Sequence, residues 1–176
     1  MKKFTTKLAV SLAAFGLMAS VASANTITSK YSLVIGGANS SYQISNFTPE
    51  NKKTGAGGNI ALNISLFDWA KDSMNFGMDI GASSVKDGYL GYADAVINWN
   101  IYKGLIIGGT AGAAGLGDTT SNTNYTGFMY GGKIGYDFTD HQGINLTYKT
   151  GTLSDTTTAV VDLDVDIATL NYIYHF

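Results

Sequence analysis

The last eight residues, Thr169 to Phe176, read Thr-Leu-Asn-Tyr-Ile-Tyr-His-Phe. The side chains of a β-strand alternate between its two faces, so Leu170, Tyr172, Tyr174 and Phe176 share one face. That face is wholly apolar or aromatic. The end of a chain usually frays into water, where a large terminal ring contributes little, so this pattern is unusual for a soluble protein. The stretch predicts a final β-strand with one face against an apolar environment.

The first residues have the three-part pattern of a secretory signal peptide. Lys2, Lys3 and Lys7 precede an apolar run over residues 8–18, and the Ala-Ser-Ala sequence at 22–24 suits a cleavage site. The apolar run is shorter than the ~20 residues that a membrane-spanning helix needs. We therefore expect residues 1–24 to be removed, leaving one mature domain over residues 25–176.

The composition favours strands and turns over helices, because the chain has 22 Gly, 11 Tyr and a single Pro. It has no Cys, which excludes a lipoprotein anchor, disulfides and thiolate metal sites, and we expect no metal or cofactor. The whole chain has 11 basic and 13 acidic residues; without the three leader lysines the formal charge is near −5, so nucleic acid is not an expected partner. Beyond the leader no apolar run suits a spanning helix, so membrane entry would require a closed barrel.

Alternation of apolar and polar residues predicts eight strands in the mature chain. The clearest case is 59–68, where Ile60, Leu62, Ile64 and Leu66 alternate with small or polar residues and a helical period fails. An even number of strands of about this length suits a bacterial single-chain barrel, whose spanning strands have ~9–11 residues. The predicted ranges are 30–37, 59–68, 74–83, 89–101, 105–115, 127–138, 144–153 and 162–176.

The predicted connections fall into two kinds. Short segments at 69–73, 102–104 and 139–143 are expected as periplasmic turns, and Gly104 suits the left-handed position of a hairpin loop. Longer polar segments at 38–58, 116–125 and 154–161, together with a short one at 84–88, are expected as extracellular loops.

A soluble barrel with an apolar interior and a membrane barrel with a polar interior both fit eight strands. The polar face of the predicted strands has few charges for a water-exposed surface, and many of its residues are glycines, which suit a narrow lumen. We therefore expect the polar face to point inward. The charged residues assigned to this lumen network are Lys30, Asp79, Asp94, Lys133, Asp137 and Lys149.

Aromatic residues gather near the predicted strand ends, which is typical of the girdles of transmembrane barrels. Tyr89, Tyr125 and Phe128 are expected at the extracellular edge. The alternative interpretation is that these rings form the core of a β-sandwich. The residues expected at the periplasmic edge include Trp69, Trp99, Tyr102, Tyr136, Phe138, Tyr174 and Phe176.

With its aromatic C-terminal residue and alternating strands, the sequence resembles the small eight-stranded outer-membrane barrels, the group with the OmpA transmembrane domain, OmpX and the Opa-type surface proteins. The resemblance implies an all-β, eight-stranded, antiparallel, up-and-down transmembrane β-barrel in the bacterial outer membrane. It also implies contact with outer-membrane lipid and lipopolysaccharide, and recognition of the C-terminal strand by the barrel-assembly machinery. Oligomeric state is left open by the sequence.

The expected function is non-enzymatic, in envelope integrity or in surface interaction through the extracellular loops. Pairing Phe138 with Ile144 would place Lys133 opposite Lys149, where carboxylates must neutralise them. These charges would form either a static network or the gate of a narrow porin-like channel, and the static network suits the width of eight strands better. A lipid A-modifying enzyme is the third hypothesis. His141, beside Asp140 in a predicted turn, has no nucleophile near it in the sequence pattern.

Two further features of the sequence are not common to all small barrels. Residues 91–95 should pair with 111–115 to give a smooth outward patch of Ala and Gly, which would contact a lipid chain or a second barrel. Asp162, Asp164 and Asp166 share a face with Leu170, and three carboxylates are not tolerated in hydrocarbon. They must stand above the bilayer, where cations would bridge them to lipopolysaccharide phosphates, or a bulge near residues 167–168 must turn them inward.

Overall fold

The computed structural model describes residues 31–45, 52–69, 73–102, 104–119, 123–156 and 161–176, except the side chains of Asp68 and Trp69. The expected leader and Lys30 lie outside these ranges, as does the predicted position of the Trp69 side chain. No helix in the described ranges is long and apolar enough to cross a membrane.

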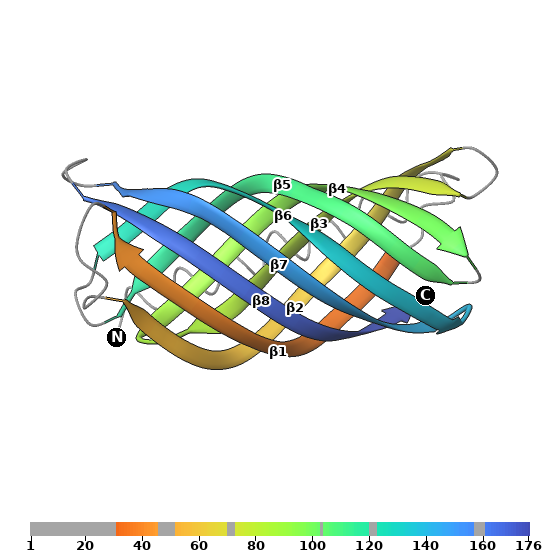
Figure 1. The fold of residues 1–176 in the computed structure, drawn as a ribbon, viewed down its shortest axis with the longest axis horizontal. Helices are drawn as coiled ribbons and strands as arrows, with labels where there is room; N and C mark the ends of the chain where they lie inside the picture. Colours follow the sequence, from red (N-terminus) through yellow and green to blue (C-terminus); the bar gives the residue numbers. More distant parts are fainter. Residues whose placement is uncertain (1–30, 46–51, 70–72, 103, 120–122, 157–160) are drawn as a thin grey trace.

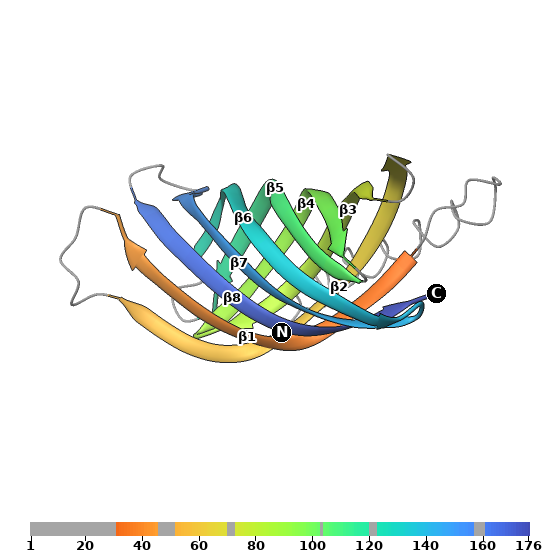
Figure 2. The same cartoon turned by 45° about the vertical axis from the view of Figure 1, so that its right-hand side comes forward.

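Eight antiparallel strands form one closed barrel in which each strand pairs with its sequence neighbours and the last pairs with the first (Figure 1). The predicted fold class is therefore confirmed. The views in Figures 1 and 2 show the strands wrapping obliquely around the barrel axis. The strands are β1 (Tyr31–Ile44), β2 (Lys53–Trp69), β3 (Met74–Val85), β4 (Gly88–Tyr102), β5 (Leu105–Asp118), β6 (Thr123–Thr139), β7 (Gln142–Asp155) and β8 (Asp162–His175).

The barrel has a turn end and a loop end. The turn end carries the β2–β3, β4–β5 and β6–β7 connections, and there the backbone N–H of Phe176 donates to the carbonyl of Tyr31 at 2.9 Å. Gly104 has a φ of 87°, as a hairpin glycine needs. The loop end carries the other connections, and the two-residue β3–β4 turn there places Asp87 at a φ of 61°. Non-glycine residues rarely adopt this conformation, but Asp tolerates it.

The strands continue further toward the loop end than predicted. Residues 38–58 were expected to be a loop, yet Ala38 pairs with Gly57 and Tyr42 with Lys53. The prediction was wrong because Gly, Ala, Ser and other small or polar residues occupy both faces of this stretch, which gives no hydrophobic period. Ser40 and Tyr42 are buried inside the barrel, while Asn39 and Ser41 point outward.

Side chains alternate between the inward and outward faces as predicted, but the prediction of a polar inward face is wrong toward the loop end, where buried residues such as Leu90 and Leu153 point into the barrel. Large apolar side chains stand exposed on the outside, among them Ile35 (50% exposed), Leu170 (62%) and Phe128 (58%). Tyr125 is an exception to the predicted upper girdle, because it points inward and packs against buried apolar residues.

Bulges near the turn end determine how some strands align. On β4 the pairing shifts between Asn100 and Tyr102, so Tyr102 pairs with Leu105. The β6–β7 connection is tighter than expected because Thr139 pairs with Gln142, and a further shift on β6 between Asp137 and Thr139 moves the register by one more residue. Lys133 therefore pairs with Thr147, and the predicted pairing of Lys133 with Lys149 is wrong by two residues.

The lumen and outer rim as the candidate functional site

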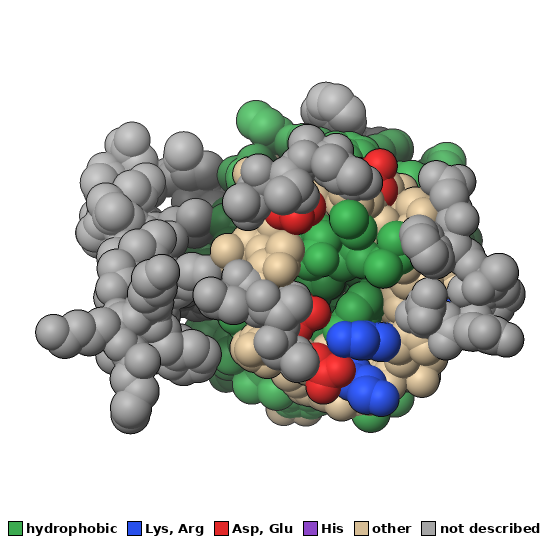
Figure 3. Space-filling view, turned by 90° about the vertical axis from the view of Figure 1, so that its left-hand side faces the viewer, with side chains coloured by type: hydrophobic (Ala, Val, Ile, Leu, Met, Phe, Trp, Pro, Cys, Tyr) green, Lys and Arg blue, Asp and Glu red, His purple; other side chains and the backbone are tan. Residues whose placement is uncertain are grey.

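The loop-end half of the lumen is filled by apolar side chains. Leu90, Leu116 and Leu153 are at most 2% exposed, and they meet Met129 and Val165 in one cluster. These residues come from β4, β5, β7, β6 and β8, so the cluster joins most of the wall. Viewed onto the loop end, hydrophobic side chains occupy the centre and charged side chains surround them (Figure 3). We call this cluster the apolar plug.

A charged contact lies on the loop-end side of the apolar plug. Lys53 Nζ is 3.5 Å from a carboxylate oxygen of Asp87 and 3.9 Å from one of Asp118. The same ammonium lies 5.6 Å from the ring centre of Tyr42, whose hydroxyl donates to the carbonyl of Lys86 at 2.9 Å. This contact connects β1, β2, β5 and the β3–β4 turn across the loop end.

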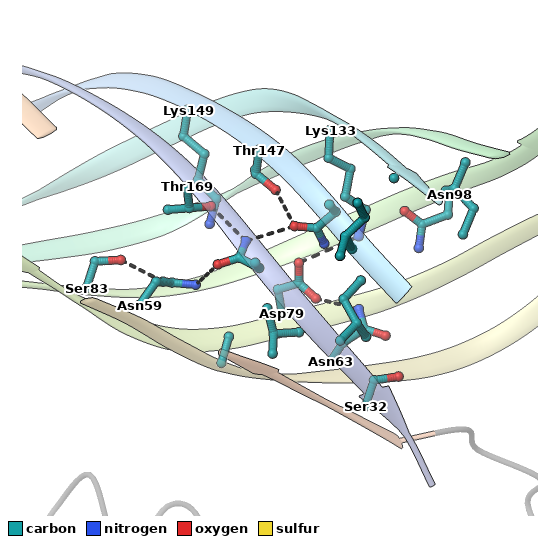
Figure 4. A pocket seen from close by; sticks show the side chains of 18 of the residues that line it. Ser32, Asn59, Asn63, Asp79, Ser83, Asn98, Lys133, Thr147, Lys149 and Thr169 are labelled. Carbon is teal, nitrogen blue, oxygen red and sulfur yellow. Dashed lines mark hydrogen bonds and ion pairs between the residues drawn. The ribbon is translucent and has the colours of Figure 1, made fainter. Parts of the chain in front are cut away.

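The other half of the lumen is polar and contains a cavity of about 70 Å³ (Figure 4). Its lining includes asparagines that hydrogen-bond to one another along the inner wall, from β2 to β8 and from β8 to β7. Asn59 Nδ2 donates to Asn171 Oδ1 at 2.8 Å, and Asn171 Nδ2 donates to Asn145 Oδ1 at 2.8 Å. Ser83 and Tyr92 both donate to Asn59 Oδ1. Because a water needs roughly 10–15 Å³ of such space, the cavity has room for only a few waters.

Lys149 and Asp94 form the most buried ion pair in the described lumen. Their side chains are 7% and 0% exposed, and Lys149 Nζ donates to Asp94 Oδ2. The same ammonium lies 3.4 Å from the ring centre of Tyr92. Asp94 Oδ1 has no hydrogen-bond partner among the described residues, so Lys149 is the group that compensates this buried carboxylate.

A second lysine, Lys133, lies closer to the turn end and is held more loosely. Its Nζ is 3.8 Å from Asp79 Oδ2, and Asp79 also accepts a hydrogen bond from Asn63 Nδ2. Nearby, the buried oxygens Asn98 Oδ1 and Thr110 Oγ1 have no hydrogen-bond partner within the described part of the chain. Asn98 lines the cavity, where a water can hydrogen-bond to its side-chain oxygen.

The structure also brings together three side chains that sequence reasoning did not connect. Ser32 Oγ lies 2.7 Å from Nδ1 of His175, whose Nε2 lies 3.2 Å from Asp137 Oδ1. A neutral imidazole with its proton on Nε2 satisfies both contacts, because it accepts from Ser32 and donates to Asp137. The inward alternation of β8 was the available signal for His175, but its partners on β1 and β6 are remote in sequence.

This Ser-His-Asp chain connects β1 and β8, the two strands that close the barrel, to β6. Ser32 is 2% exposed, whereas the side chains of His175 and Asp137 are each 26% exposed. His141, the other histidine, is exposed and its Nδ1 lies 3.1 Å from the carbonyl oxygen of His175. In the described ranges no group of three or more His, Cys, Asp or Glu residues is arranged to hold a metal.

The predicted girdle residues whose side chains are described lie outside the barrel near the turn end. Tyr174 contacts Phe176 edge to face, with ring centres 5.3 Å apart. Trp69 lies at the end of β2, but its side chain is not described. The exposed members are Trp99, Tyr102, Tyr136, Phe138, Tyr174 and Phe176.

The three aspartates of β8 keep the outward register, because pairing is continuous from Ser154–Asp162 to Gln142–Tyr174. The alternative of a bulge near residues 167–168 is therefore wrong. Asp164 accepts from Thr152 Oγ1 at 3.0 Å, and Asp166 accepts from the hydroxyl of Tyr148 at 2.8 Å. Both carboxylates lie on the outer wall toward the loop end.

The predicted smooth patch has the expected register, since Gly91, Ala93 and Ala95 pair with Gly115, Ala113 and Ala111. The patch extends toward the turn end through the outward Gly109–Gly132 pair. Whether it contacts a lipid chain or a second barrel stays a prediction.

Solved structures with a similar fold include Ail and NspA. Ail, the attachment invasion locus protein of Yersinia pestis, matches with a TM-score of 0.57 and 14% identity over 85% of this chain and 100% of Ail. Neisserial surface protein A (NspA) matches with a TM-score of 0.53 and 13% identity over 82% of this chain and 95% of NspA. Both are small eight-stranded outer-membrane barrels. No protein-family model matches, and the search of curated proteins found no relative.

Proposed function

We propose that this chain is an integral barrel of the bacterial outer membrane that does not conduct and that acts through its outer surface and loops, in envelope integrity or surface interaction. The observation that carries the proposal is the apolar plug, in which Leu90, Leu116 and Leu153 leave almost no exposed surface. Close-packed side chains of this kind leave no path for a hydrated ion.

The membrane location is supported by the arrangement of the outer wall. Aliphatic side chains such as Ile97, Ile134 and Leu170 are about half exposed or more, which would be costly in water for so continuous a belt. The aromatic residues of the turn end flank this belt on one side. The turn end would then face the periplasm and the loop end the exterior. Removal of residues 1–24 and recognition of β8 by the assembly machinery are parts of the same proposal.

A narrow channel is the second candidate, favoured by the polar cavity with its Lys133 and Asp79 charges near the turn end. Planar-bilayer recording of the folded protein separates the two. We expect no current steps from the parent chain, and small steps after Leu90→Ala and Leu116→Ala are combined to open the plug. Current steps in the parent that disappear in Lys133→Met or Asp94→Asn would overturn the non-conducting proposal.

A lipid-modifying enzyme is the least supported candidate, because the Ser32 side chain, which would be the nucleophile of the Ser32–His175–Asp137 chain, is only 2% exposed. Lipid analysis of cells with and without the protein tests it. Unchanged acyl composition agrees with the proposal, and a change that depends on Ser32 would contradict it. Migration of the unheated protein on a gel, compared with the heated protein, tests the folded barrel in the outer-membrane fraction.

A further inference from the structure

A polar groove of about 560 Å³ lies on the outer wall, across the neighbouring strands β7, β8, β1 and β2. Its lining carries hydrogen-bonding groups of several kinds, namely an amide, hydroxyls, a carboxylate and an ammonium. We call it the outer groove. The side chains that supply these groups are Asn39, Ser41, Lys52, Thr54, Tyr148 and Asp166.

The strand register explains why these groups converge. Asn39 lies between Ala168 and Ala56 in one row, and Ala168 in turn pairs with Tyr148. In the next row, Ser41 lies between Asp166 and Thr54. The two alanines are small, so the polar groups surround a depression and do not cover it.

The carboxylate in the groove is held in place before any ligand arrives. The hydroxyl of Tyr148 donates to Asp166 Oδ1 at 2.8 Å, and Ser41 Oγ donates to Asp166 Oδ2 at 3.5 Å. A carboxylate has about four acceptor positions, so further donors can bind to it. A fixed acceptor next to an exposed amide suits a ligand with several hydroxyl groups, because sugars donate and accept at closely spaced positions.

The groove continues onto the apolar belt. One row closer to the turn end, the outward residues are Leu170, Gly37 and Gly58, and the following row contains Ile35 and Ile60. A Cβ atom on Gly37 or Gly58 would be 4.0 or 3.9 Å from its nearest neighbour, so packing within the chain does not require glycine there. The polar groove is therefore bordered on its turn-end side by apolar wall with two glycines in it.

We infer that the outer groove binds a glycolipid of the outer leaflet, with its sugar headgroup on Asn39 and Asp166 and an acyl chain over Gly37 and Gly58. This inference rests on the proposed function, because only a barrel spanning the outer membrane places the groove at headgroup level. Lys52 would bind an acidic substituent of the sugar. A glycerophospholipid fits less well, since its headgroup offers fewer hydroxyl groups to the Asp166 carboxylate and the Asn39 amide.

The experiment measures binding of lipopolysaccharide to the barrel folded in phospholipid vesicles. Asn39→Ala and Asp166→Asn should each weaken binding about tenfold, which corresponds to about 1.4 kcal/mol. Thr126→Ala, outward on β6 and away from the groove, is the matched control and should bind like the parent. Gly37→Leu should weaken binding of intact lipopolysaccharide and leave binding of its lipid-free saccharide unchanged.

Equal affinity of the parent and both groove variants would overturn the inference, as would equal competition by phosphatidylglycerol. Heat-modifiable gel migration and bilayer recording on the same preparations report the fold and the absence of conduction. Normal insertion without groove-dependent binding would refute the glycolipid site alone, whereas failure to insert would refute the proposed function.

Discussion

Replacing Lys149 by methionine would leave the Asp94 carboxylate without its charged partner. Methionine has a similar length and is apolar, so the substitution removes the ammonium with little change in volume. The Asp94 side chain is 0% exposed, and its Oδ1 has no hydrogen-bond partner among the described residues. Water therefore cannot replace the lost ammonium without a change in the packing around it.

The loss of stability expected for Lys149→Met follows from this burial. Removing one partner of a buried ion pair costs about 3–5 kcal/mol, because the remaining charge is uncompensated. Loss of the contact between the ammonium and the Tyr92 ring adds on the order of 0.5–2 kcal/mol. A domain with a total stability of about 5–15 kcal/mol would lose a large fraction of it.

The measurement is urea-induced unfolding of the barrel in lipid vesicles, followed by tryptophan fluorescence and by gel migration. Lys149→Met should be strongly destabilised. The double variant Asp94→Asn, Lys149→Met should recover most of the loss, since neither partner then carries a charge. Lys133→Met is the control: it should cost clearly less, because Asp79 is 17% exposed and keeps its bond from Asn63.

Two results would refute this reasoning. The first is a Lys149→Met variant within about 1 kcal/mol of the parent, which would mean that the pair is solvated or dispensable. The second is a double variant as unstable as the single one, which would mean that the side-chain shape of Lys149 matters and its charge does not.

Three further predictions test other parts of the barrel. Gly131→Ala should lower the free energy of unfolding by about 1–3 kcal/mol, because an inward Cβ would overlap the backbone carbonyl of Tyr148. The outward Gly132→Ala should be nearly neutral, because its Cβ would lie 3.6 Å from the nearest atom. Equal urea midpoints for the two variants would contradict this prediction. His175→Ala should lose about 1–3 kcal/mol of stability, because the hydrogen bonds of the imidazole to Ser32 and Asp137 are removed. His141→Ala should lose less stability, and the temperature at which gel migration changes reports both variants. A larger effect at His141 would count against a role of His175 in closing the barrel. Ile134→Lys in the apolar belt should reduce stability in vesicles by about 2–4 kcal/mol, whereas Thr126→Lys should be tolerated. Equal refolding yields for these two variants would argue against a lipid-facing belt.

Local alternation was enough to predict the eight strands and which side chains point inward. It worked best in 59–68, where four aliphatic residues alternate with small or polar ones, and at the C-terminal strand. It failed in residues 38–58, where β1 and β2 lengthen without a hydrophobic period. It also failed for Tyr125, because an aromatic residue near a strand end suits a girdle and a lumen equally well.

The pairs that make up the lumen could not be predicted in the same way. The β6–β7 register depends on a bulge beside Asp137, and without that bulge Lys133 is placed opposite the wrong residue. The Lys149–Asp94 pair joins residues 55 apart in sequence, and Ser32 lies 143 residues from His175. The first contact spans the lumen between β7 and β4, and the second joins directly paired residues of β1 and β8. Both therefore depend on barrel closure and on the register of several strands together.

The sequence by itself thus determined an alternating chain with an apolar outside, a polar inside and an aromatic closing strand, because side-chain direction in a strand depends only on residue parity. The tertiary structure decided that the inside is sealed by an apolar plug at the loop end, and that polar groups on four strands form the outer groove. The physical reason is that strand pairing and barrel closure, which no single segment determines, set which inward residues meet and which outward residues share a row.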